Sequence, residues 1–281
     1  MRCAAECPKH PRPMRPPTED PGIVSAELLP TPLELRQELP LSETGASFVQ
    51  AQRAAVRAVL QGHDDRLLCV VGPCSIHDVD AAFAYAEQLA AQAASYADAL
   101  VVVMRVYFEK PRTSVGWRGL LHDPRLDGSL RVHEGLRLAR SLLVRLADRG
   151  VAAGTEVLDP ITPRYIADAI TWGAIGARTA ESSIHRELVS GLGFPVGIKN
   201  ATSGSVQVAI DAIGAAARGR RLPGVTLDGR AAVLTTAGNA DGHLILRGGD
   251  SGPNFAAAPV RQALEALMGG RRRRDERRAG R

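Results

Sequence analysis

Long apolar runs are missing from the sequence, since none approaches the ~18–20 residues that a membrane-spanning helix needs. No stretch resembles a signal peptide either. These absences exclude the membrane-embedded class, and we expect a cytoplasmic protein without a membrane partner. Cysteine is also scarce, and the placement of the four residues excludes a disulfide framework: Cys3, Cys7, Cys69 and Cys74. Cys3 and Cys7 lie near His10, but with no second half-site they do not predict a metal site.

Lysine is almost absent, with three residues among the 35 basic ones: Lys9, Lys110 and Lys199. The net charge of +5 is confined to residues 271–281, where seven arginines stand against Asp275 and Glu276. The rest of the chain is therefore neutral, which argues against a nucleic-acid partner. The alternative is that the arginine-rich segment is a genuine basic tail for nucleic acid or an acidic surface.

The composition of the 281 residues, 45% of them hydrophobic, is sufficient for the core of one large α/β domain. Residues 1–22 are rich in proline and charge and are expected to form a disordered tail. We expect an N-terminal arm and helix over residues 23–62, and a partial barrel domain over 63–268. Residues 269–281 are expected to form an arginine-rich tail.

Strand and helix patterns alternate through the domain. Asp78 is predicted to cap one helix, and Thr162, followed by Pro163, to cap another. The predicted strands are 67–71, 100–105, 151–158, 174–178, 195–199 and 243–247, with a hairpin at 224–236. The predicted helices are 44–60, 79–94, 134–148, one from 162 that ends before 173, 181–190, 205–217 and 259–268. These patterns predict an α/β fold of the (β/α)8 TIM-barrel family with about six βα units, an arm and an inserted β-hairpin.

Cations follow the predicted strands. In residues 101–113, VVVMRVYFEKPRT, an apolar run is followed by Arg105, Lys110 and Arg112, and Pro111 stiffens the turn between the last two. Later apolar runs end before Arg178, Lys199 and Arg247. Because parallel strands in an α/β barrel end on one face, and that face carries the chemistry, we expect an anion site there. The alternative for each cation is a solvated surface charge.

Five runs of residues resemble the microbial type I 3-deoxy-D-arabino-heptulosonate 7-phosphate (DAHP) synthases. They occur in the family's order: DDRLLCVVGPCSIHD (64–78), VMRVYFEKPRTSVGWRGLLHDP (103–124), ITPRYIADAITWGAIGARTAESSIHRELVSGL (161–192), PVGIKNATSG (195–204) and LILRGG (244–249). The resemblance implies condensation of phosphoenolpyruvate with erythrose 4-phosphate, which releases phosphate in the first step of aromatic amino-acid biosynthesis.

The resemblance also implies roles for the cations, since phosphoenolpyruvate carries both a carboxylate and a phosphate. Five positions match the residues that hold it: Arg105, Lys110, Arg178, Lys199 and Arg247. The run Lys110-Pro111-Arg112-Thr113 matches the loop that receives the sugar phosphate. Lys199 is also implied as a proton donor, and Glu156 as the residue that positions the attacking water.

Cys74 matches one ligand of the family's divalent metal, manganese or a similar ion. Three further ligands, a histidine, a glutamate and an aspartate, come from the seventh and eighth strand ends of the family, which this sequence does not contain. We therefore expect a truncated member, with residues 271–281 read out of frame after a frameshift or a misplaced stop. The alternative function is a catalytically inactive homologue that binds phosphoenolpyruvate or a partner subunit without turnover.

Feedback regulation by an aromatic amino acid is a further implication of the resemblance. Gly193 and Gly224 match positions that tend to be small in tyrosine-sensitive members and serine in phenylalanine-sensitive ones, which slightly favours tyrosine. A homo-oligomer is the family's expectation.

Overall fold

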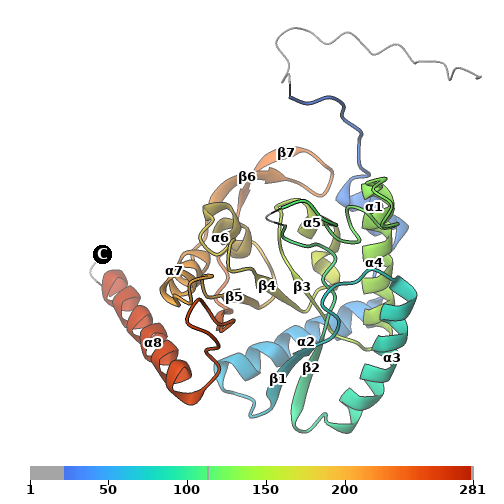
Figure 1. Ribbon diagram of the computed structural model, residues 1–281. Helices are drawn as coiled ribbons and strands as arrows, with labels where there is room; N and C mark the ends of the chain where they lie inside the picture. Colours follow the sequence, from blue (N-terminus) through green and yellow to red (C-terminus); the bar gives the residue numbers. More distant parts are fainter. Residues whose placement is uncertain (1–21, 113, 280–281) are drawn as a thin grey trace, which may run out of the picture.

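Six parallel strands form the centre of the molecule. The structure is a computed structural model that describes residues 22–112 and 114–279. The strands are β1 (Leu67–Val71), β2 (Leu100–Arg105), β3 (Ala153–Glu156), β4 (Trp172–Ile175), β5 (Val196–Lys199) and β8 (Gly242–Ile245). They pair in the order β1-β2-β3-β4-β5-β8, and every pairing is parallel. The sheet curls as part of a barrel does (Figure 1), so the predicted fold class is confirmed.

Helices cover the outer side of the sheet and the amino-terminal ends of its strands. They are α1 (Pro32–Glu38), α2 (Glu43–Gln61), α3 (Val79–Ser95), α4 (Val132–Asp148), α5 (Thr162–Ile166), the 3-10 turn η1 (Ala167–Ala169), α6 (Ser183–Ser190), α7 (Gln207–Ala216) and α8 (Ala257–Ala279). As predicted, Asp78 caps α3 by accepting the N–H of Ala81 at 2.9 Å. Gly62, with φ of 73°, ends α2 in the left-handed conformation that glycine tolerates.

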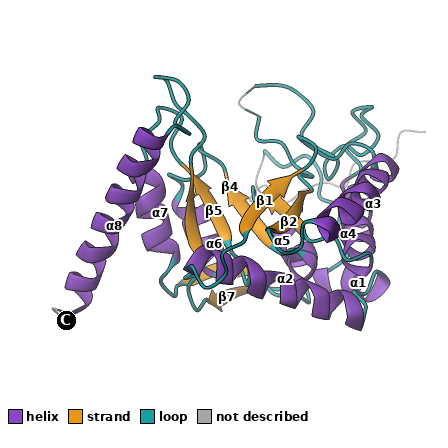
Figure 2. Ribbon diagram, turned by 90° about the horizontal axis from the view of Figure 1, so that it is seen from below, coloured by secondary structure: helices purple, strands orange, loops and turns teal. Residues whose placement is uncertain are grey.

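Two groups of apolar side chains hold these layers together. The leucines of α4 pack against the neighbouring helices and the outer side of the sheet, and Leu142, Leu143 and Leu146 are fully buried. Val56 of α2 packs with Val103 of β2 and Trp172 of β4. Helix α2 therefore closes the amino-terminal end of the sheet and leaves the opposite end to the loops (Figure 2).

A two-stranded hairpin, β6 (Arg221–Val225) and β7 (Ala231–Thr235), is inserted between α7 and β8. Its turn contacts the arm, because the N–H of Leu33 donates to the carbonyl of Leu227 at 2.8 Å. The predicted hairpin and arm are both present, and the hairpin begins three residues earlier than predicted. Within the described part of the chain, no helix combines the length and hydropathy needed to cross a bilayer.

Four of the six strands are shorter than predicted, β3 and β4 among them. For the strand predicted at 151–158, the N–H of Val151 donates to Leu146 at the end of α4 and not to a neighbouring strand. The strand predicted at 174–178 is Trp172–Ile175. It ends there because the carbonyl of Gly176 accepts the N–H groups of Thr179 and Ala180, which forms a turn.

The predicted cap at Thr162 is wrong. Thr162 is the first residue of α5, and the carboxylate of Asp159 accepts the N–H groups of Ile161 at 2.7 Å and Thr162 at 2.9 Å. An ionised carboxylate is the stronger acceptor at a helix start, so the aspartate takes this role.

The predicted end of the last helix near residue 268 is also wrong, since α8 continues to Ala279. Arginine and alanine are both good helix formers, and the segment contains no proline. Helix α8 lies beside α7 at the outside of the molecule in both views (Figures 1 and 2).

Candidate functional site

The strands all finish at the same end of the sheet, and the long loops gather at this carboxyl-terminal end (Figure 2). The strand register places polar side chains at this carboxyl-terminal end. Arg105 of β2 pairs with Gly154, Glu156 of β3 pairs with Ala174, and Lys199 of β5 pairs with Ile245. Parallel pairing therefore brings residues from separate parts of the sequence to the same end of the sheet.

The close approach of β1 and β2 requires a glycine at the end of β1. Gly72 has φ of 138°, and a Cβ on it would lie 3.1 Å from the backbone nitrogen of Arg105. The chain therefore turns directly beside Arg105 as it leaves β1 and leads into Cys74.

Lys110 and Cys74 are in direct contact. The Nζ of Lys110 donates to the carbonyl of Cys74 at 2.9 Å and lies 3.0 Å from its sulfur. This hydrogen bond and the positive charge of Lys110 lower the pKa of the Cys74 thiol, and Arg105 and Arg112 contribute further. The contact therefore favours a thiolate next to the predicted phosphoenolpyruvate cations.

Lys199 and Arg105 lie near a shared aromatic ring. The Nζ of Lys199 is 3.5 Å from the carboxylate of Glu156, which is buried. The ring of Tyr107 lies 4.3 Å from the guanidinium carbon of Arg105 and 5.8 Å from the Nζ of Lys199. The Nε of Arg105 is buried and has no hydrogen-bond partner, which leaves a donor available for an anion.

The remaining predicted cations lie on the loops that follow the strands. Arg178 donates to the carbonyl of Pro111 at 3.2 Å, and Arg112 to the carbonyl of Trp117 at 2.9 Å. Arg247 reaches the carbonyl of Thr202 at 3.4 Å, on the loop after β5. The contact of Arg178 joins the loops after β2 and β4, and that of Arg247 joins the loops after β5 and β8. Thr113, a predicted ligand of the sugar phosphate, lies outside the described residues.

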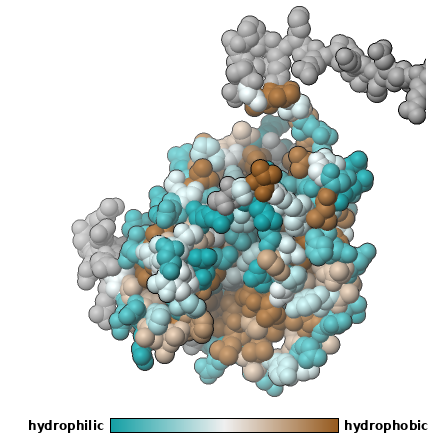
Figure 3. All heavy atoms as spheres, viewed as in Figure 1, coloured by the Kyte–Doolittle hydropathy of each residue, from teal (hydrophilic) through white to brown (hydrophobic). Residues whose placement is uncertain are grey.

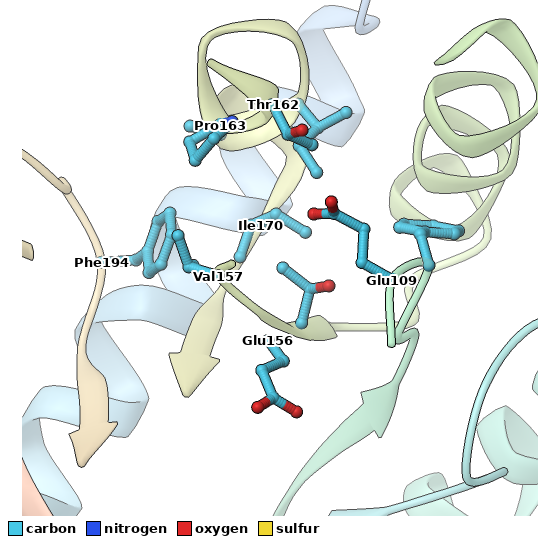
Figure 4. A pocket seen from close by; sticks show the side chains of 11 residues that line it. Glu109, Glu156, Val157, Thr162, Pro163, Ile170 and Phe194 are labelled. Atoms are coloured by element: carbon cyan, nitrogen blue, oxygen red, sulfur yellow. The ribbon is translucent and has the colours of Figure 1, made fainter. Parts of the chain in front are cut away.

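Sequence reasoning missed a buried carboxyl beside Lys110. Figure 4 shows the side chain of Glu109 directed toward Thr162, whereas the carboxylate of Glu156 points to the opposite side. Burial first, and then the neighbouring Asp159, raise the pKa of Glu109 to about 8. Nδ1 of His122 lies 3.9 Å away, and burial lowers the pKa of that histidine, which disfavours its charged form. The available signal was an acidic residue directly after an apolar stretch.

The comparisons with known proteins agree with this arrangement. The model of the DAHP synthetase I family matches residues 39–271. This chain belongs to that family. The match confirms the resemblance found in the sequence. Members of the family are 3-deoxy-7-phosphoheptulonate synthases, which are transferases, so the predicted enzyme class is confirmed as well.

Individual relatives are identical to this chain at about half of the aligned residues. It is 52% identical over 241 residues to the Phe-sensitive phospho-2-dehydro-3-deoxyheptonate aldolase of Escherichia coli strain K12, covering 86% of this chain and 68% of that protein. To the Tyr-sensitive enzyme of the same strain it is 49% identical over 245 residues, covering 87% and 68%. The solved structure of the aldolase from Francisella tularensis SCHU S4 is 47% identical with a TM-score of 0.87, covering 88% of this chain and 73% of that one.

A divalent metal, which the resemblance to DAHP synthases implies, does not fit the described residues. In residues 22–112 and 114–279, no group of three or more His, Cys, Asp or Glu side chains is placed to hold a metal ion. Cys74 is the one predicted ligand, and a single thiolate does not form a site for manganese, which prefers oxygen and nitrogen ligands. The described part of the chain therefore assigns no step of the reaction to a metal.

The two glycines predicted to face an effector differ in the space around them. A Cβ on Gly193 would meet only the Nη1 of Arg53, at 4.0 Å, so a larger residue fits there. A Cβ on Gly224 of β6 would lie 2.5 Å from a methyl carbon of Leu234, which would have to move. The assignment of these positions to an effector site stays a prediction.

Proposed function

We propose that this DAHP synthase family member condenses phosphoenolpyruvate with erythrose 4-phosphate and releases phosphate. The observation that carries the proposal is the cluster of cations at the carboxyl-terminal ends of the parallel strands, among which Arg105 keeps a buried donor free. A substrate with a carboxylate and a phosphate requires several fixed cations on one face.

In the proposed reaction, C3 of phosphoenolpyruvate attacks the aldehyde carbon of the sugar, and a water oxygen adds to C2. The C2–oxygen bond to phosphate then breaks, phosphate leaves and a keto acid remains. Lys199 supplies a proton to the aldehyde oxygen, and Glu156, 3.5 Å from Lys199, positions the water. Arg105, Lys110, Arg178, Lys199 and Arg247 hold phosphoenolpyruvate, and the segment 110–113 holds the sugar phosphate.

The cofactor and effector belong to the same proposal. Manganese or a similar ion is the cofactor expected from the family, and Cys74 would be one ligand of a site that is incomplete in the described residues. Because relatives of both sensitivities are known, an aromatic amino acid is the expected effector class, with tyrosine slightly favoured through Gly193 and Gly224. A cytoplasmic homo-oligomer is proposed, with domain limits at 1–22, 23–62, 63–268 and 269–281.

The decisive experiment measures phosphate release from phosphoenolpyruvate by the full 281-residue chain. Release that depends on erythrose 4-phosphate would support the proposal, and a further dependence on added manganese would support a metal-dependent enzyme. The substitutions Lys110→Ala and Arg178→Ala should each lower kcat/KM by roughly a hundredfold or more, because each removes a charge that stabilises the transition state. Arg149→Ala is the matched control, since that arginine pairs with Glu87 on an exposed surface.

Two results would contradict the proposal. Near-normal rates in both alanine variants would contradict the assignment of Lys110 and Arg178 to the substrate site. Binding of phosphoenolpyruvate without phosphate release would favour the alternative of an inactive binding protein, which the comparisons do not support.

A further inference from the structure

Tyr107 connects two predicted phosphoenolpyruvate cations that belong to separate strands. Arg105 ends β2 and Lys199 ends β5, and two other strands lie between these in the sheet. The ring of Tyr107 lies 4.3 Å from the Arg105 guanidinium and 5.8 Å from the Lys199 ammonium. Both distances are within the range of a cation–π contact, so one ring contacts both charges.

The surroundings of Arg105 show why a ring is suited to this place. Among the described residues, Arg105 has no carboxylate within ion-pair distance, and its buried Nε has no acceptor. A carboxylate partner would occupy the donors that an anionic substrate needs. The face of an aromatic ring attracts the cation electrostatically and leaves its N–H groups free.

The main chain around Tyr107 holds the ring in place. The carbonyl of Tyr107 accepts the N–H of Ile76 at 2.9 Å, two residues after Cys74. The N–H of Val106 donates to the carbonyl of Gly154 at 2.8 Å, which ties the segment to β3. The Tyr107 residue is only 4% exposed, so the ring has little freedom to leave the two cations.

The hydroxyl group of Tyr107 stays protonated, so the side chain carries no charge. Burial raises the pKa of Tyr107 to about 12, and the nearby Arg105 only partly opposes this effect. The interaction with both cations is therefore that of a neutral aromatic ring over the pH range in which the enzyme is assayed.

We propose that Tyr107 is a positioning residue that holds Arg105 and Lys199 in place for the substrate anion through the face of its aromatic ring. Naming the anion as phosphoenolpyruvate rests on the proposed function. The role itself requires only that an anion with a phosphate or carboxylate group binds between the two cations.

The test replaces Tyr107 with phenylalanine and with its 4-fluoro, 3,5-difluoro and pentafluoro derivatives, introduced at position 107 of the full chain. Fluorine withdraws charge from the ring face with little change of shape. Phenylalanine should preserve binding, and the dissociation constant for phosphoenolpyruvate should rise with each addition of fluorine. For the pentafluoro variant the rise should be roughly threefold to thirtyfold.

Kinetics provide a second measurement. The KM for phosphoenolpyruvate should follow the fluorine series, while the KM for erythrose 4-phosphate stays constant. A residue that only fills space would give no trend, because the variants have nearly the same shape, and thermal melting of each variant verifies that it folds. A flat series in both binding and KM would overturn the inference.

Inorganic phosphate, titrated into the same variants, separates this inference from the proposed function. A fluorine trend in phosphate binding without turnover of phosphoenolpyruvate would support the role of Tyr107 and contradict the proposed function. Turnover of phosphoenolpyruvate without a fluorine trend would support the proposed function and contradict the role of Tyr107.

Discussion

At the scale of single residues, the pair of Glu109 and Asp159 joins the loop that carries Lys110 to the start of α5. Asp159 is committed to the helix, because it accepts the N–H groups of Ile161 and Thr162. Glu109 is buried beside it. Two carboxyl groups in contact are stable when one holds a proton, and the raised pKa of Glu109 identifies it as the protonated one.

The substitution Glu109→Gln is expected to change how stability depends on pH. The pKa of Glu109 rises from 4.5 to about 8 on folding, so its contribution is fully present below pH 4.5 and is lost as the pH rises through 8. The glutamine variant keeps a neutral side chain. Relative to the native chain, its free energy of unfolding should therefore rise between pH 5 and pH 9, by on the order of a few kcal/mol.

Urea unfolding at pH 5, 7 and 9 measures this difference. The control is Glu87→Gln, at an exposed glutamate that pairs with Arg149. Parallel pH curves for the native chain and Glu109→Gln would show that Glu109 ionises normally.

At the scale of elements, buried arginines join the arm and α2 to the barrel helices. Arg140 of α4 is 1% exposed, and its guanidinium donates to both carboxylate oxygens of Asp168 at 2.9 Å and to the carbonyl of Leu39 at 2.8 Å. Arg36 of α1 reaches the same carboxylate at 3.6 Å. Arg53 of α2 donates to the carbonyls of Ala167 and Ile170. Asp168 in η1 therefore forms ion pairs with arginines from two helices, α4 and α1.

Asp168→Ala is expected to destabilise the fold by roughly 2–4 kcal/mol, because it leaves the guanidinium of Arg140 buried without a counter-charge. Urea unfolding at pH 7 measures the loss. Glu38→Ala is the control, since it removes an exposed partner of Arg137 and should leave the midpoint nearly unchanged. Equal midpoints for the two variants would contradict the assigned importance of the buried pair.

At the scale of the whole molecule, the described sheet has two edges. Strands β1 and β8 each have a neighbouring strand on one side only. Figure 3 shows apolar side chains gathered over the region of β1 and β2, and Leu67 at the start of β1 is 70% exposed. Exposed apolar strands at a sheet edge favour pairing with other chains.

The 281-residue chain is accordingly expected to form larger assemblies as its concentration rises, and Leu67→Lys should reduce them. A lysine at an edge strand opposes pairing because its charge would have to be buried. Light scattering coupled to size-exclusion chromatography measures the distribution of masses. Leu264→Lys, on α8, introduces the same charge away from the sheet and should have no such effect. An equal reduction in both variants would indicate a simple effect of net charge.

The amino-acid sequence by itself determined the order of the six parallel strands, the hairpin and the helices from α2 onward, and the positions of the cations after the strands. Apolar periodicity, the cap at Asp78 and the stop at Gly62 act between residues close in the chain, so they can be recognised without the fold. The limits of β3 and β4 and the cap of α5 could not be predicted, because several local hydrogen bonds compete there. The sequence predicted the cap at Thr162, and only the folded geometry shows that Asp159 accepts the N–H groups at the start of α5.

Only the tertiary structure decided which side chains meet at the site. Tyr107 contacts Lys199 because β2 and β5 curl toward one another, and Lys110 contacts Cys74 because β1 and β2 end side by side. The pKa of Glu109 likewise depends on burial against a residue from another loop. Such contacts join residues far apart in the chain, and their energies depend on distance and on exclusion of water, which a linear pattern of residues does not contain.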